Sequence, residues 1–184
     1  MIYPIYIIGT PVLRKVAKDI DKDYPELDSF IENMWGTMYK TDGVGLAAPQ
    51  VGKSIRLFVV DGNPLKKDYP ELDGFKKCFI NAHITERSKK TWSFNEGCLS
   101  IPDIREDVNR PTWIRIEYYD ENWNFHDEIF EGGQARIMQH EYDHLDGILF
   151  TDKISPIRRR LIKNKLNQIA KGKIKPKYKH ILVK

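Results

Sequence analysis

The sequence predicts an α+β protein in which strands of antiparallel sheet wrap around a central helix, with a further helix near the C-terminus. Residues 113–119 and 125–130 alternate apolar and polar side chains on either side of a polar turn, the pattern of a hairpin. The stretch after Gly133 carries apolar side chains on several sides of a helix, which implies burial on most faces. Ser155 and Pro156 supply the cap and first-turn proline of the last helix.

Two more helices are predicted in the first 40 residues. Thr10 and Pro11 are a helix-start pair, so we expect a short helix over residues 11–18. Asp23 is the expected N-cap of a second helix that ends near Lys40. Its apolar residues recur at helical spacing on one face: Leu27, Phe30, Ile31, Met34, Trp35 and Met38.

The middle of the chain predicts short strands separated by loops. Residues 55–60, 78–80 and 84–90 are strand candidates, and Cys78 is expected to pack in the core. Residues 63–74 contain two prolines and flanking glycines and predict a surface loop.

Two stretches are unusual in composition. Residues 41–50 hold two glycines and a proline, which favours a tight loop whose backbone lies close to another group, although a plain connector has the same composition. Residues 92–102 place a glycine beside Cys98 and end in proline, so we expect an irregular bend that exposes a thiol.

Composition predicts one soluble domain in a reducing compartment. The chain has 184 residues, of which 41% are hydrophobic and 30% charged. We expect a cytoplasmic protein without membrane attachment, because no apolar run is long enough to span a bilayer and the first residues lack a secretory signal. We also expect a monomer. Two cysteines are too few for a disulfide framework.

Charge is distributed unevenly along the chain. Residues 153–184 hold 12 Lys+Arg and no Asp or Glu, whereas the rest holds 18 Lys+Arg against 26 Asp+Glu, a net charge of −8. A basic segment on an acidic body indicates contact with a polyanion, or serves only to keep the protein soluble.

The motif HEYDH at residues 140–144 points to chemistry. As a helix it places His140 and His144 one turn apart, where two imidazoles can bind one metal ion, with Glu141 close enough to act on a water there. The alternative is a buried helix with two hydrogen-bonded histidines. A catalytic site usually has a third ligand. No glutamate follows Glu141, which leaves the distant His180 or the upstream Cys98.

At this point the sequence resembles the peptide deformylase family. Residues 43–50 (GVGLAAPQ), 96–100 (EGCLS) and 140–147 (HEYDHLDG) look like its three signature motifs, in the family's order. The resemblance extends from about Ile7 to Lys171. It implies a catalytic domain over residues 1–172 that removes the formyl group from N-formylmethionyl nascent polypeptides and releases formate. Residues 173–184 would then form a basic tail.

The resemblance also implies roles for single residues. The metal ligands are Cys98, His140 and His144. Glu141 is the general acid and base, Gln50 and the backbone N–H of Leu99 stabilise the oxyanion, and Gly45 presents its backbone to the substrate. Side chains expected along the bound peptide are Val44, Arg105 and Ile137. Glu96 either orients a ligand or is a turn carboxylate, and Arg110 and Asp143 resemble a structural ion pair.

The implied metal is one divalent ion per chain, ferrous iron in cells, with zinc, nickel or cobalt as substitutes. A deformylase works on chains that leave the ribosome, so we expect ribosome contact through the basic helix, or else a merely solvated face. The residues concerned are Arg158, Arg159, Arg160, Lys163 and Lys165.

Two other functions share some of these features. A peptide-cleaving metalloprotease is disfavoured by the cysteine, the missing downstream glutamate and the Gln50 loop, and intact peptide bonds after reaction would exclude it. A non-enzymatic RNA-binding protein would use residues 153–184, but no aromatic RNA-binding motif accompanies them.

Overall fold

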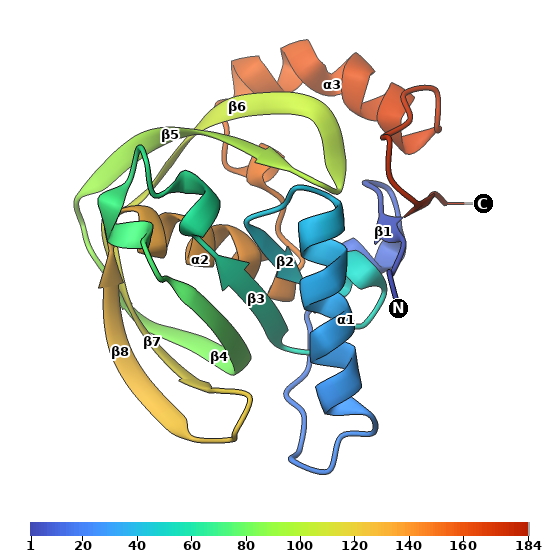
Figure 1. The fold of residues 1–184 in the computed structure, drawn as a ribbon. Coiled ribbons are helices and arrows are strands. Elements are labelled where there is room, and N and C mark those ends of the chain that lie inside the picture. The colour runs from blue at the N-terminus through green and yellow to red at the C-terminus, as the bar shows by residue number, and fades with distance from the viewer. Residues whose placement is uncertain (184) are drawn as a thin grey trace.

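The computed structural model describes residues 1–183 and has the predicted α+β architecture (Figure 1). An antiparallel sheet has the strand order β2-β3-β4-β7-β8. The bounds of its strands are Gly45–Ala47 (β2), Leu57–Asp61 (β3), Lys76–Arg87 (β4), Trp113–Tyr119 (β7) and Phe125–Glu131 (β8). A separate antiparallel hairpin consists of β5 (Thr91–Cys98) and β6 (Ile101–Pro111). The short strands β1 (Ile5–Tyr6) and β9 (His180–Ile181) pair in parallel.

Three α-helices complete the fold: α1 (Leu27–Lys40), α2 (Gly132–Leu145) and α3 (Pro156–Ala170). Helix α2 contacts β2, β3 and β8 on one side and β6 on the other, so it runs between the sheet and the β5–β6 hairpin (Figure 1). The chain also forms 3₁₀ turns at Pro11–Arg14, Ala48–Val51, Asn63–Leu65, Pro70–Leu72 and Phe150–Asp152. Within residues 1–183, no helix has the length and apolar character needed to cross a bilayer.

Strand β3 separates two hydrophobic cores. Successive side chains of a strand point to opposite faces, so Leu57 and Val59 pack with α1, whereas Phe58 and Val60 pack with α2. All five residues of β3 are buried, which explains its continuous apolar sequence. The central helix is thereby held against the sheet by a core of its own.

Several predicted elements are confirmed. The hairpin of β7 and β8 and the end of α1 at Lys40 lie where the pattern placed them. Ser155 caps α3, because its Oγ accepts a hydrogen bond from the Arg158 N–H at 3.3 Å. Cys78 is buried in the core.

Other predictions were wrong because long-range hydrogen bonds override local patterns. The helix expected over residues 11–18 is only the 3₁₀ turn Pro11–Arg14, since the Ala17 N–H bonds to the Leu145 carbonyl at 2.7 Å. Asp23 does not cap α1, which begins after Glu26 without a side-chain cap.

The strand predictions need correction as well. The strands expected over residues 78–80 and 84–90 are one strand, β4, which ends at Arg87. The irregular bend expected over residues 92–102 is confined to its middle: residues 92–97 are regular strand, the register shifts between Gly97 and Cys98, and a two-residue turn follows. The loop at residues 41–50 contains the short edge strand β2.

The end of α2 depends on Gly147. Its φ is +70°, its N–H bonds to the His144 carbonyl at 3.3 Å, and the next N–H, of Ile148, bonds to the Asp143 carbonyl at 2.9 Å. These two bonds form the glycine-dependent motif that closes helix C-termini. A Cβ on Gly147 would lie 2.7 Å from the backbone carbonyl of Arg14.

We therefore predict that Gly147→Ala lowers the free energy of unfolding by about 3 kcal/mol, from left-handed strain and from overpacking against backbone. Gly74→Ala is the matched control, because Gly74 has φ +72° but a Cβ added there would meet no atom within 4 Å. The control should lose only about 1 kcal/mol, the cost of the backbone strain alone. Equal losses in denaturant titrations would contradict the predicted clash with Arg14.

Candidate metal centre

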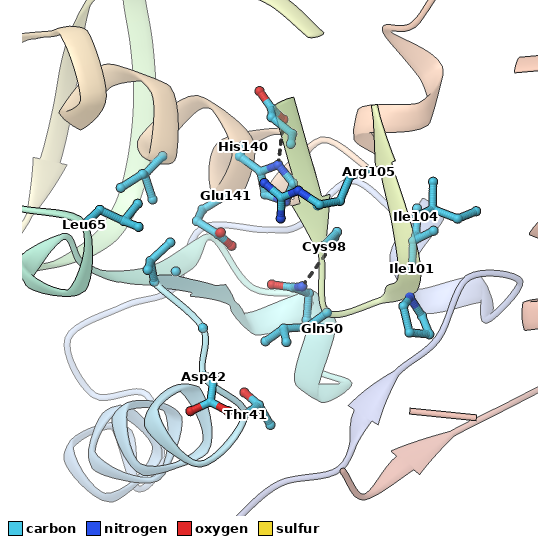
Figure 2. A pocket seen from close by; sticks show the side chains of 18 of the residues that line it. Thr41, Asp42, Gln50, Leu65, Cys98, Ile101, Ile104, Arg105, His140 and Glu141 are labelled. Carbon is cyan, nitrogen blue, oxygen red and sulfur yellow. Dashed lines mark hydrogen bonds and ion pairs between the residues drawn. The ribbon is translucent and has the colours of Figure 1, made fainter. Parts of the chain in front are cut away.

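Three segments that are distant in sequence meet beside α2. Strand alternation places Glu96 and Cys98 on one face of β5, and helical spacing places His140 and His144 on one face of α2. The end of the 3₁₀ turn at Ala48–Val51 brings Gln50 to the same point. Figure 2 shows Gln50, Cys98, His140 and Glu141 gathered around one space.

The donor atoms of this group suit a divalent metal ion. One atom each from Cys98, His140 and His144 lie within 4.8 Å of one another. The Cys98 Sγ is 3.3 Å from the His144 Nε2. A thiolate and two imidazoles are a ligand set for zinc- or iron-like ions, and three protein ligands leave a position open for chemistry. The structure thus brings together the three predicted ligands and leaves His180 outside the group, on β9.

Glu96 is the centre of a buried ion cluster. Its Oε2 lies 2.9 Å from the His140 Nδ1 and accepts a hydrogen bond from Arg110 at 2.9 Å. Its Oε1 accepts from Arg110 at 2.6 Å and from Arg136 at 2.8 Å. Burial opposes ionisation of Glu96, but these hydrogen bonds and charges outweigh it and hold the pKa of the carboxyl below its usual value. The turn-carboxylate alternative for Glu96 is therefore wrong.

The cluster continues to the last turn of α2. Arg110 also donates to the Asp143 Oδ2 at 2.6 Å, which confirms the expected ion pair. Lys153 lies 3.3 Å from the other oxygen of Asp143. The side chain of Arg110 is 2% exposed, so its charge depends on these carboxylates for compensation.

Glu141 faces β2 across a very short gap. A Cβ on Gly45 would lie 2.7 Å from the Glu141 Cδ, so this position has no room for a side chain. The Glu141 Oε2 is buried and has no hydrogen-bond partner within residues 1–183. Burial raises the pKa of Glu141 to about 7, although the positive charges of His140 and Arg110 oppose that rise. A buried carboxylate with a free oxygen and a pKa near neutrality can exchange a proton with a bound water.

Two hydrogen-bond donors lie at the thiol. The Gln50 Nε2 is 3.5 Å from the Cys98 Sγ and 3.3 Å from the Ser100 Oγ, and its Oε1 is fixed by the Ala47 N–H at 2.9 Å. The Leu99 N–H donates no hydrogen bond within residues 1–183, and Leu99 lines the adjoining cleft. The Gln50 amide is thus hydrogen-bonded to Cys98 and Ser100, whereas the Leu99 N–H has no partner in the described chain.

A cleft of about 790 Å³ opens onto this group. Val44, Arg105 and Ile137 line it, and Figure 2 shows Arg105 and Leu65 on opposite sides of the centre. The 63–74 loop, whose role the sequence left open, contributes apolar side chains to the wall: Leu65, Tyr69 and Leu72.

Sequence reasoning missed two further residues of this region. Arg136 donates to Glu96 and stacks with its guanidinium 4.7 Å from the Trp92 ring. Its position one helical turn before His140 could have indicated it. Tyr178 also lines the cleft, and no local pattern marks it, because it arrives from a segment far along the chain.

Comparisons with known proteins agree with this geometry. A sequence model described as polypeptide deformylase matches residues 2–160. The peptide deformylase of Christiangramia forsetii is 56% identical, covering 97% of this chain and 95% of that protein, and the one of Flavobacterium psychrophilum is 54% identical, covering 100% and 98%. The crystal structure of a peptide deformylase from Legionella pneumophila superposes with a TM-score of 0.81 at 33% identity, covering 96% of this chain and 100% of that one.

The ion cluster leads to a prediction about metal retention. Glu96→Gln should weaken retention of a bound metal about 10–100-fold, the usual effect of removing a carboxylate that orients a ligating histidine. Glu106→Gln is the control, since Glu106 lies opposite Glu96 in the hairpin but pairs with Arg158. Dialysis against a chelator followed by metal analysis measures the difference. Equal retention in both variants would show that Glu96 does not support the site.

Proposed function

We propose that this chain, which belongs to the peptide deformylase family, binds its metal ion through Cys98, His140 and His144. The family hydrolyses the formyl group from N-formylmethionyl nascent polypeptides and releases formate, so the chain is a metal-dependent hydrolase. Because the chain belongs to this family, we no longer consider the peptide-cleaving metalloprotease or the non-enzymatic RNA-binding protein as its function. The observation that supports the ligand set most directly is the convergence of one thiol and two imidazoles beside a buried carboxylate.

The proposed mechanism assigns a task to each side chain. A divalent ion held by Cys98, His140 and His144 would act as a Lewis acid and would lower the pKa of a water molecule bound to it. Glu141 takes the proton from the attacking water and later gives it to the leaving amine. Gln50 and the Leu99 N–H donate hydrogen bonds to the oxygen of the formyl group as negative charge develops there. Burial of the free Glu141 oxygen supports its role, because such an oxygen is directed at a partner that the protein itself does not supply.

The apolar wall of the cleft is the proposed site for the methionine side chain. Val44 and Ile137 line this wall, and the 63–74 loop adds further apolar side chains to it. The loop is tied to the start of α2, because the Glu71 Oε1 accepts a hydrogen bond from the Gly133 N–H at 2.9 Å. Arg105, which is hydrogen-bonded to Asn95 at 2.9 Å, is proposed to lie along the bound peptide.

For the base, we predict that Glu141→Gln retains its metal but loses about three to four orders of magnitude in kcat, because no other group replaces the proton transfer. Glu131→Gln is the control, as Glu131 is an exposed carboxylate at the start of the same helix. Turnover of formyl-Met-Ala at a near-parental rate by Glu141→Gln would refute the assignment.

For the metal, we propose ferrous iron in cells, with zinc, nickel or cobalt as functional substitutes, because mixed nitrogen and sulfur ligands accept all four. Metal analysis of anaerobically purified protein should find about one iron per chain, and Cys98→Ala should lose most of it. Cys78→Ala removes the other thiol, which is buried away from the site, and should keep the full content. Equal content in all three proteins would contradict the role of Cys98.

We also propose that the solvent face of α3 contacts ribosomal RNA, in the cytoplasm where nascent chains are made. The helix packs on the body through Ile162, Leu166 and Ile169. Part of its positive charge is already engaged: Arg158 pairs with Glu106, Arg159 with Asp152, and Lys165 bonds to the Asp103 carbonyl. Arg160 and Lys163 are exposed and have no carboxylate within 4.0 Å in the described chain.

This distribution of charge sharpens the test. Arg160→Glu combined with Lys163→Glu should weaken ribosome binding at low salt and reduce its salt dependence, since two phosphate contacts are lost. Lys89→Glu with Lys90→Glu makes the same charge change in the turn before β5 and should leave binding intact. Both proteins should deformylate a free peptide normally. Parental ribosome affinity in the α3 variant would leave α3 with a packing and solubility role alone.

A further inference from the structure

Residues 173–183 return to the active-site cleft after α3. Strand β9 pairs in parallel with β1, with the Ile5 N–H bonded to the Lys179 carbonyl at 2.9 Å and the Ile7 N–H to the Ile181 carbonyl at 3.0 Å. Figure 1 shows both chain ends on the same side of the molecule. Just before β9, residues 175–178 line one end of the cleft. This segment is therefore part of the wall around the site.

The paired ends hold the turn that follows Cys98. The Tyr178 hydroxyl donates to the Leu99 carbonyl at 2.5 Å, and the Ile8 N–H donates to the Ser100 carbonyl at 2.9 Å. Two successive carbonyls of this two-residue turn are thus fixed by the two chain ends. The Leu99 N–H, in contrast, has no partner within residues 1–183.

We infer that Tyr178 is a positioning residue for deformylation, because its hydroxyl, by fixing the Leu99 carbonyl, holds the Leu99 N–H where the oxyanion develops. The inference rests on the proposed role of Leu99 as an oxyanion donor. A donor contributes most when it is already in place before charge develops, and small misplacements of such groups have large effects on rate. The Leu99 N–H belongs to the preceding peptide plane, between Cys98 and Leu99. Hydrogen bonds that hold the next two planes of the turn limit its rotation through the φ and ψ angles of Leu99.

A purely structural role for Tyr178 makes a different prediction. Its ring is partly buried and packs against the core that lies under α1. If packing were its whole role, removal of the hydroxyl alone would change nothing in catalysis. Leu99 borders an open cleft, so in a variant without the hydroxyl a water molecule can donate to its carbonyl instead. Removal of the hydroxyl should therefore lower the rate of catalysis rather than the stability of the fold.

The first measurement compares Tyr178→Phe with Tyr39→Phe. Tyr39 lies on α1, outside the cleft lining, and its hydroxyl donates to the Asp61 Oδ2 at 2.8 Å. Tyr39→Phe therefore controls for the loss of a tyrosine hydrogen bond. Tyr178→Phe should lower kcat about 5–20-fold, less than the loss of a whole oxyanion donor, with KM, metal content and melting temperature unchanged. A parental kcat, or a loss that follows metal content or melting temperature, would overturn the inference.

The second measurement asks whether Tyr178 acts through Leu99. Leu99 is the first residue of a two-residue turn, a position that accepts proline, so Leu99→Pro removes the N–H while Leu99→Ala removes only the side chain. If the inference holds, adding Tyr178→Phe to Leu99→Pro slows the enzyme no further, because the group being positioned is already gone. The same 5–20-fold loss in both backgrounds would mean that Tyr178 acts elsewhere.

These variants separate the two proposals. Equal activity of Leu99→Pro and Leu99→Ala would overturn the oxyanion role of Leu99 itself, and with it the inference. A slow Leu99→Pro with a fully active Tyr178→Phe would overturn only the role of Tyr178. Because Tyr178→Phe keeps the ring, its result decides the inference even if Leu99→Pro does not fold.

Discussion

The site depends on the charge of Glu96, buried between β5, β6 and α2. Removing a carboxylate from water is costly, and only strong, well-aligned partners make it tolerable. Here Arg110 and Arg136 donate to it from two directions, and Asp143 balances the second positive charge. Because the partners come from one strand and from the central helix, the cluster fixes how the hairpin and α2 sit against each other. That relation also sets the distance between Cys98 and the two histidines.

The same carboxylate determines the chemistry of His140. A carboxylate beside Nδ1 favours the tautomer with its proton on that nitrogen, which leaves Nε2 with a free lone pair for a metal. His144 differs, since its Nδ1 is buried without a partner in residues 1–183, and burial together with the nearby positive charges of His140 and Arg110 lowers its pKa. Loss of solvent therefore favours the neutral form of His144. Burial also opposes a charge on His140, but its hydrogen bonds to Cys98 and Glu96 raise its pKa overall, so a metal ion at its Nε2 has to displace a proton.

Local patterns in the sequence identified elements whose stabilising contacts are mostly local. The sequence predicted the apolar face of α1, the β7–β8 hairpin and the cap of α3 correctly. In each case the signal, whether hydrophobic period, turn or capping residue, lies within the segment itself. The region after Pro11 was misread, because bonds to Leu145 and Ser54 replace helical ones. In the site, spacing alone joined His140 to His144, whereas Cys98 and Gln50 could be assigned only through the family motifs. The contributions of Arg136 and Tyr178 depend on long-range packing, which no local pattern encodes.

The parallel pairing of β1 with β9 has a consequence for how the protein is made. Translation delivers β1 before any other described element and β9 after all of them, so the edge of β1 stays open while the rest of the fold forms. Pairing two segments so far apart in sequence has an entropic cost of loop closure. This cost falls once the residues between them have folded, because the flexible loop that remains is then shorter. The wall of the cleft around Tyr178 is then among the last parts to assemble, and a nascent molecule forms the hydrogen bond from Tyr178 to Leu99 only after α2 has been made.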